Sequence, residues 1–299
     1  MRILMLNNEY PPLGGGTGTV NQAVLQRLAQ VPGLEIDLIT SALGKISETV
    51  TLSPGTRILK VPVNNQNIHH SSNRELITFA VRSFFLALKE HRRVRYDLCF
   101  AWSAVPAGSV ALAMKQLAGL PYIVRVCGPD IPGFERRYRW LYPILTPLIR
   151  AIWRGARTVV AKCAGEADLI RAVDKKASIT IIPNGVDLNT FRPGEPIPAN
   201  GPLRLLCVGR LIERKGQHHL IEAVKRLTDE GIEVTLDLIG TGDAEPEFKA
   251  LTDRLGLEGR FRIPGSNQVQ GDFNPFVGQP LDRFDQVMLP LALDQSPHA

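Results

Sequence analysis

Short apolar runs alternate along the chain with longer segments in which apolar residues recur at helical spacing. The short runs predict buried strands, and the longer periodic segments predict amphipathic helices. Their alternation is typical of a doubly wound parallel sheet. The expected strands lie near residues 2–7, 34–40, 57–63, 97–101, 121–126, 157–161 and 178–182, and the expected helices near 17–30, 74–91, 106–119, 139–154 and 163–173.

A second series of the same kind begins near residue 203. Between the two series lies the stretch FRPGEPIPANGP, whose many Pro and Gly residues favour a linker. We therefore expect an α/β protein with two doubly wound domains. The second series has expected strands near 203–208 and 233–239 and expected helices near 216–230 and 245–255. The expected bounds are 1–190 for the first domain, 191–202 for the linker and 203–299 for the second domain.

Composition narrows the choice of partners. The chain has 299 residues and a formal net charge of +6, which mildly favours anionic substrates or surfaces without requiring nucleic acid. Its start, MRILMLNN, predicts a strand and not a signal peptide. The four cysteines lie far apart without metal-ligand spacing, so we expect reduced core thiols and a cytoplasmic protein. These cysteines are Cys99, Cys127, Cys163 and Cys207.

The first strand runs directly into a glycine-rich connection, NNEYPPLGGGTGTV. Glycines let a backbone approach phosphate closely, and the next helix would aim its N–H groups at the same place. The loop is not a dinucleotide fingerprint, because Thr19 occupies the position of the third glycine and no acid ends the second strand. A purely structural turn remains the alternative.

A second strand-to-helix connection, VGRLIERKG, carries Arg210 and Lys215. Such connections form the ligand crevice at the carboxyl ends of parallel strands, and the following helix presents unpaired N–H groups. The pattern favours an anion site, and the alternative is a pair of solvated surface charges.

Five stretches, taken in order, make the chain resemble a nucleotide-sugar-dependent glycosyltransferase. The resemblance is to the GT-B type with two Rossmann-like domains, in the large retaining family 4. It implies that the second domain is incomplete in this sequence. The stretches are PPLGGGTGTVNQAVLQRLA, RVCGPDIPG, IIPNGVDLNTFRP, VGRLIERKGQHHLIEAV and LIGTGDAEPEF.

The resemblance assigns donor-binding roles in the second domain. Arg210 and Lys215 match the residues that hold the diphosphate of the donor. Gly240 and Gly242 match the loop beneath the nucleotide, and the backbone near Ile263 would meet the base. Simple turn chemistry is the alternative for the two glycines. The implied donor is a UDP- or GDP-linked sugar, which is a substrate, so no cofactor is expected.

The resemblance also assigns residues to the first domain. Gly15 and Gly16 match glycines that approach donor and acceptor, and Asp130 matches a catalytic position on the sugar side of the cleft. Histidine is frequent near this position in the family, whereas Cys127 stands there in this sequence. Asp130 could equally cap the segment that follows it.

The family's paired glutamates are only partly matched. The stretch DQVMLP resembles the strand that precedes them, and Asp294 falls where the first glutamate should stand, as a second catalytic candidate. The partner position would follow Ala299, the last residue. We therefore expect a glycosyltransferase that turns over poorly or not at all as a truncated chain. The alternative is a non-catalytic truncated relative in a nucleotide-binding or scaffold role.

No metal site is expected. The sequence contains no Asp-X-Asp pair, and the adjacent histidines lack a set of further ligands at useful spacing. Surface positions are the simpler interpretation of both histidine pairs, which are His69 with His70 and His218 with His219.

The stretch YRWLYPILTPLIRAIWR combines a broad apolar stripe with flanking arginines. A core helix with solvated arginines explains it, and weak docking to an anionic membrane is the alternative. Docking would suit a lipid-linked acceptor as well as a carbohydrate one. It would place a cytoplasmic protein peripherally at the inner face of the membrane.

Overall fold

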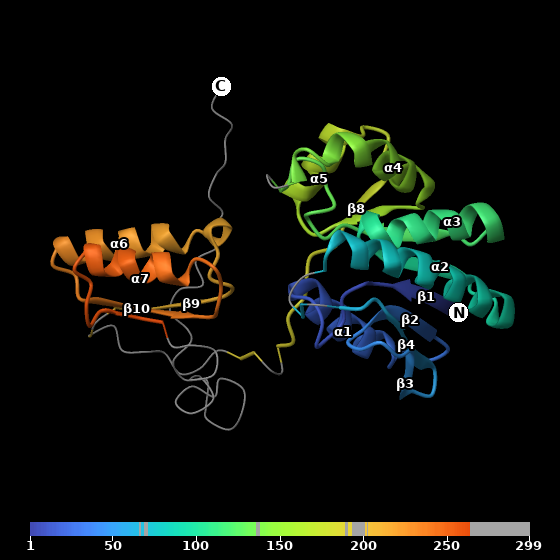
Figure 1. Ribbon diagram of the computed structural model, residues 1–299, viewed down its shortest axis with the longest axis horizontal. Coiled ribbons are helices and arrows are strands. Elements are labelled where there is room, and N and C mark those ends of the chain that lie inside the picture. The colour runs from blue at the N-terminus through green and yellow to red at the C-terminus, as the bar shows by residue number, and fades with distance from the viewer. Residues whose placement is uncertain are drawn as a thin grey trace. The chain divides into compact units, whose positions relative to one another are not determined.

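The computed structural model describes residues 1–65, 67–68, 71–135, 138–188, 191–192, 201 and 203–263. The chain forms two compact units, Met1–Gly185 and Val186–Ala299, and each is described by itself. Both contain strands and helices in alternation, which confirms the predicted α/β class (Figure 1). Most of 191–202 lies outside the described residues, so its role as a linker stays a prediction.

The first unit is built on an eight-stranded sheet with the order β3-β4-β2-β1-β5-β6-β7-β8. Its strands are β1 Arg2–Leu6, β2 Glu35–Ala42, β3 Glu48–Ser53, β4 Thr56–Pro62, β5 Leu98–Trp102, β6 Tyr122–Arg125, β7 Val159–Ala161 and β8 Ile179–Ile181. Its helices are α1 Gly16–Leu28, α2 Asn73–Val94, the π-helical turn η1 Ala104–Gly108, α3 Ser109–Ala118, α4 Tyr142–Gly155 and α5 Ala164–Val173.

Helices cover the two faces of this sheet unequally. Leu4 of β1 packs in one core with Phe79 of α2, whereas its neighbour Met5 packs in another with Leu25 of α1. Successive side chains of a strand point to opposite faces, so α1 covers one face. Helices α2, α3, α4 and α5 contribute to the core on the other face (Figure 1).

The sheet is not purely parallel, which corrects one expectation. Strand β3 pairs antiparallel with β4 across a turn that contains Pro54 and Gly55, while the other neighbouring pairs are parallel. All six residues of β3 are exposed or half-buried. An edge strand that buries neither face needs no apolar run, which is why the hydrophobic pattern did not reveal it.

The second unit has a parallel three-stranded sheet with the order β11-β10-β9 in its described part. Alternate residues of β10 are fully buried, and together with α6 and α7 they form the core of the unit. Strand β9 was expected to be buried, but its residues are half-buried or exposed. The elements are β9 Leu203–Val208, the 3-10 turn η3 Glu213–Lys215, α6 Gln217–Asp229, β10 Val234–Ile239, α7 Glu245–Arg254 and β11 Phe261–Arg262.

The cysteines differ in burial more than expected. Cys99 in β5 is fully buried, and burial raises the pKa of its thiol. Cys163 is exposed immediately before α5, so it is not a core thiol. Among the described residues, no helix combines the length and apolar character needed to span a bilayer.

Candidate functional site

Arg210 and Lys215 lie in one loop at the carboxyl end of β9. Both side chains are exposed, and neither forms an ion pair or side-chain hydrogen bond within the described part of the chain. Lys215 lies close enough to oppose the rise in the Cys207 thiol pKa that burial causes, so its ammonium group acts at the end of β9. The loop therefore presents two cations available to an anion.

The same loop leads into an open helix end. Gly216 precedes α6 with φ +72°, and no side chain caps the helix. Gln217 is buried, and its side-chain amide donates to the Arg210 carbonyl at 2.9 Å. This bond fixes the loop against α6, so the cations stand beside the positive end of the helix dipole.

Gly240 and Gly242 bring a second strand exit against this loop. A Cβ atom on Gly240 would lie 2.0 Å from the Gly209 carbonyl oxygen, and one on Gly242 would lie 2.1 Å from the Leu211 oxygen. No side chain fits at such distances. Close backbone packing therefore requires glycine at both positions, whether or not a nucleotide binds there. Their contact with a nucleotide stays a prediction.

Ile263 follows β11 directly and is half-buried against the core of the second unit. Since β9, β10 and β11 are parallel, Arg210, Lys215, Gly240 and Ile263 all follow strand ends at one edge of the sheet. The structure thus places the donor-binding positions predicted in the second domain at one edge of its sheet, whereas Gly15 and Gly16 belong to the first unit.

Gly15 and Gly16 lie at the start of α1, where the exit of β1 turns into the helix. A Cβ atom on either glycine would meet nothing within 4 Å, whereas one on Gly14 would clash with Glu9 at 2.6 Å. Gly14 also has φ +92° and is required by the fold of the loop. Gly15 and Gly16 instead border open space that a bound molecule can occupy.

Asp130 braces the loops that follow β5 and β6. Its carboxylate accepts from the Ala104 amide at 2.6 Å and from the Cys127 amide at 2.8 Å. Desolvation raises the pKa of this carboxyl group, and the backbone hydrogen bonds partly oppose the rise. Both donors precede Asp130 in the chain, so these contacts do not cap the segment that follows it, as the alternative proposed. The catalytic role of Asp130 stays a prediction.

Arg125 is a buried cation that the sequence analysis did not single out. It ends β6, stacks on Trp102 with its guanidinium carbon 5.0 Å from the ring centroid, and donates to the Asn184 side chain. Desolvation lowers its pKa. An arginine at the end of an otherwise apolar strand run was the available signal. Its contacts tie the exit of β6 to the segment after β8.

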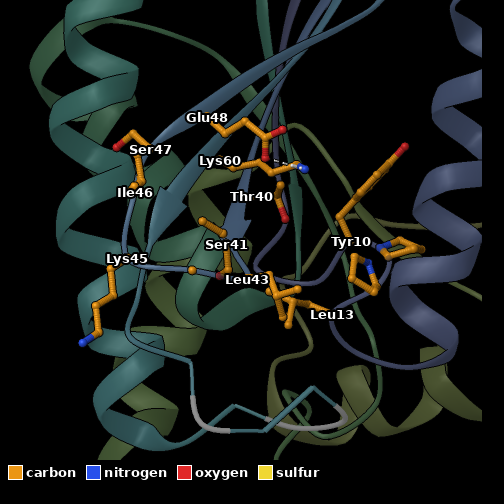
Figure 2. A pocket seen from close by; sticks show the side chains of 14 residues that line it. Tyr10, Leu13, Thr40, Ser41, Leu43, Lys45, Ile46, Ser47, Glu48 and Lys60 are labelled. Atoms are coloured by element: carbon orange, nitrogen blue, oxygen red, sulfur yellow. Dashed lines mark hydrogen bonds and ion pairs between the residues drawn. The ribbon is translucent and has the colours of Figure 1, made fainter.

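A pocket of about 450 Å³ opens at the carboxyl ends of β1, β2 and β4. Figure 2 shows Leu13 and Leu43 close together in it, while Lys45 extends away from them. Glu48 and Lys60 form an ion pair at 2.9 Å across the β3-β4 pair. The full lining comprises Tyr10, Pro11, Pro12, Leu13, Thr40, Ser41, Ala42, Leu43, Gly44, Lys45, Ile46, Ser47, Glu48 and Lys60.

Several predicted residues fall outside the described part of the chain. They are Asp294, the strand-like stretch 285–290, and the pair His69 and His70. The rings of His218 and His219 lie 3.9 Å apart at the start of α6. Within the described ranges, no group of three or more His, Cys, Asp or Glu side chains could hold a metal ion.

Comparison with known proteins gives the class. The glycosyl transferase 4-like domain family matches residues 15–185, and the glycosyl transferases group 1 family matches residues 191–273. Since the first match spans more than half of the chain, the protein belongs to the glycosyl transferase 4-like family. This finding confirms the resemblance drawn from the sequence motifs.

Individual relatives agree with this class. The chain is 33% identical over 135 residues to the lipopolysaccharide core biosynthesis glycosyltransferase LpsE of Rhizobium meliloti, covering 44% of this chain and 37% of LpsE. It thus spans well under two thirds of that relative's length. A second relative, the putative colanic acid biosynthesis glycosyltransferase WcaL of Escherichia coli, is 33% identical over 91 residues, 30% of this chain and 22% of WcaL.

Solved structures show the fold. Sucrose-phosphate synthase from Thermosynechococcus elongatus superposes with a TM-score of 0.70 at 19% identity, covering 89% of this chain and 70% of that one. A trehalose-6-phosphate protein from E. coli, bound with UDP-2-fluoro glucose, gives a TM-score of 0.60 at 12% identity, with coverages of 88% and 73%. The fold is therefore GT-B, with two Rossmann-like domains.

Proposed function

We propose that the protein transfers a sugar, with retention of anomeric configuration, from a nucleoside diphosphate sugar to a carbohydrate or lipid-linked acceptor. The observation that carries the proposal is the pair of unpaired cations, Arg210 and Lys215, beside the uncapped start of α6. Membership of a glycosyltransferase family supports the reaction class. The bound UDP-2-fluoro glucose of a protein with the same fold supports the donor class.

The chemistry follows from the charges. The bond between the anomeric carbon and the β-phosphate oxygen breaks, the acceptor oxygen bonds to that carbon, and the acceptor proton leaves with the diphosphate. The leaving group gains negative charge during this step. Arg210, Lys215 and the N–H groups of α6 stabilise that charge, so no metal ion is needed in the proposed mechanism.

The acceptor site is proposed in the first unit. The pocket beside Leu13 shares its loop with Gly15 and Gly16, the glycines that border open space. Leu13, Leu43 and Ile46 supply an apolar surface, while Thr40 and Ser41 add hydroxyl groups. This lining suits an acceptor with both an apolar part and hydroxyl groups.

The donor site can be tested by titration calorimetry of residues 1–299 with UDP, GDP and ADP. We expect Arg210→Ala and Lys215→Ala each to weaken binding by roughly ten- to a hundredfold, since a charge-assisted contact contributes about 1.5–3 kcal/mol. Arg226→Ala, at the far end of α6, removes the same charge and serves as the matched control. Equal affinities for all four proteins would refute the site.

Turnover requires a separate assay. Incubation with UDP- and GDP-sugars and a panel of carbohydrate and lipid-linked acceptors, followed by mass spectrometry, would detect transfer. Proton NMR of the product would then report the anomeric configuration. Nucleotide binding without any product across the panel would favour a non-catalytic binding role.

A further inference from the structure

Three neighbouring helices of the first unit carry large apolar side chains on their exposed surface. Helix α3 contacts both α2 and α4, so the three form one layer over a single face of the sheet. On α2, Ile77, Val81 and Phe85 recur every four residues and share one face. The exposed fractions are 66% for Ile77, 51% for Val81, 64% for Phe85, 69% for Leu117, 69% for Ile144 and 38% for Leu148, and Trp140, in the turn before α4, is 67% exposed.

The exposed charged side chains of this layer are all positive. Helices α2, α3 and α4 contain two acidic residues, Glu75 and Glu90, and both are buried. Arg74, Lys89 and Arg92 of α2 are exposed and form no ion pair or side-chain hydrogen bond with any described residue. Further cations on the layer are Arg82, Lys115, Arg139 and Arg150, while Arg93 and Arg154 are ion-paired with Glu90 and Asp174.

We propose that the outer surface of α2, α3 and α4, with the turn before α4, docks on an anionic lipid bilayer. Apolar side chains at helical spacing among cations, without exposed acids on these three helices, match the way basic amphipathic helices bind at a membrane interface. On α5, the fourth helix of this face, the exposed Asp168 is paired with Arg171. Charge complementarity selects this occupant over a second copy of the chain, because two copies would bring like charges together. The inference does not rest on the proposed transfer activity.

The sequence around α4 predicted either a core helix or a membrane-docking helix, and the structure shows features of both. Ile149, Ile152 and Trp153 of α4 are buried in the core, as the core-helix interpretation requires. Trp140 and Ile144 are not, so the same stretch also contributes to the surface. Helix α2 was not expected to take part, because its exposed stripe is visible only once its buried face is known.

Co-sedimentation of the full chain with vesicles tests the proposal. We expect binding to vesicles of phosphatidylcholine mixed with phosphatidylglycerol, little binding to phosphatidylcholine alone, and weakening by salt. Lys89→Gln and Arg92→Gln should each weaken binding about fivefold, the effect of one cation near an anionic surface. Phe85→Ser and Ile144→Ser should each weaken it roughly tenfold or more, because an inserted apolar side chain is lost.

Two matched controls lie outside the layer. Val31→Ser removes an exposed apolar side chain beyond α1, on the opposite face, and Arg226→Gln removes an exposed cation of α6 in the second unit. Both should bind vesicles like the unaltered protein. The substituted side chains are exposed, so thermal unfolding should be unchanged, and Ile77→Ser provides a second α2 variant if Phe85→Ser misfolds.

Three results would overturn the proposal. They are absence of salt-sensitive binding to the anionic vesicles, equal losses in the control and layer variants, and a dimer in solution that Phe85→Ser dissociates. The last result would assign the surface to self-association instead of a bilayer.

Discussion

At the scale of single residues, Asp130 has a role that follows directly from its contacts. It accepts hydrogen bonds from backbone amides of two strand exits, Ala104 and Cys127. Asp130→Ala would leave both donors without this partner, and we expect a loss of about 2–4 kcal/mol in the free energy of unfolding. Urea denaturation followed by circular dichroism measures it. A loss below about 0.5 kcal/mol would show that water replaces the carboxylate at no cost.

The glycines give a contrasting pair of substitutions. Gly242→Ala forces a Cβ atom against the Leu211 carbonyl, so we expect clear destabilisation of the second unit. Gly15→Ala meets no neighbour within 4 Å and should leave stability nearly unchanged while reducing transfer activity. Thermal unfolding of both variants, together with the transfer assay, separates the two roles. Full activity of Gly15→Ala would argue against the predicted approach of substrate at this glycine.

Some residue positions could be predicted from the sequence, whereas individual side-chain contacts could not. Arg210 and Lys215 were predictable at a strand exit, because an apolar run followed by helical periodicity fixes where the loop begins and ends. The contact of Asp130 with Ala104 was not, since it joins residues that are 26 positions apart. Sequence spacing carries no information on which backbone amide a carboxylate will meet.

At the scale of elements, an ion pair links α4 to the segment after α5. Arg154 donates to Asp174 at 2.7 Å, and this hydrogen bond lowers the pKa of the buried Asp174 carboxyl group. The folded-state pKa lies below the unfolded value of about 3.9. The pair therefore contributes stability above that pH, and the contribution is lost as pH falls through the folded-state pKa.

Acid denaturation tests this link between elements. We expect Asp174→Asn to be less stable than the unaltered protein at neutral pH and to lose less stability on acidification. Melting temperatures measured from neutral pH down to about pH 3 give both slopes. Parallel curves for the two proteins would mean that other carboxyl groups dominate the acid response.

Most elements were expected within about three residues of their observed bounds, and the exceptions share a cause. Strand β3 buries neither face, and β11 comprises two residues, so neither has a hydrophobic period of its own. The pocket beside Leu13 was also missed. The pocket forms where the carboxyl ends of β1, β2 and β4 lie side by side. This arrangement depends on the order of the strands in the sheet, which the hydrophobic pattern of a single segment does not reveal.

At the scale of the whole molecule, the chain divides into two units, and the boundary along the sequence lies between residues 185 and 186. The Pro- and Gly-rich stretch that follows has few residues suited to helix or strand. We expect limited proteolysis to cut within 186–202 and to leave a stable fragment of the first unit. Mass spectrometry of the fragments locates the cuts. First cuts within the strands of the first unit would contradict this division.

If the outer surface of α2, α3 and α4 docks on a bilayer, its position on one face of the sheet affects how the protein would encounter a lipid-linked acceptor. In a layered α/β unit the helices run roughly along the strands, so docking through α2, α3 and α4 would lay the sheet parallel to the bilayer. Its carboxyl edge, with Gly15 and the pocket, would then face sideways along the membrane plane. An acceptor carried by a lipid would arrive by lateral diffusion, a search in two dimensions. Initial rates should therefore follow the surface density of the acceptor: diluting it with carrier lipid at constant bulk concentration should slow transfer.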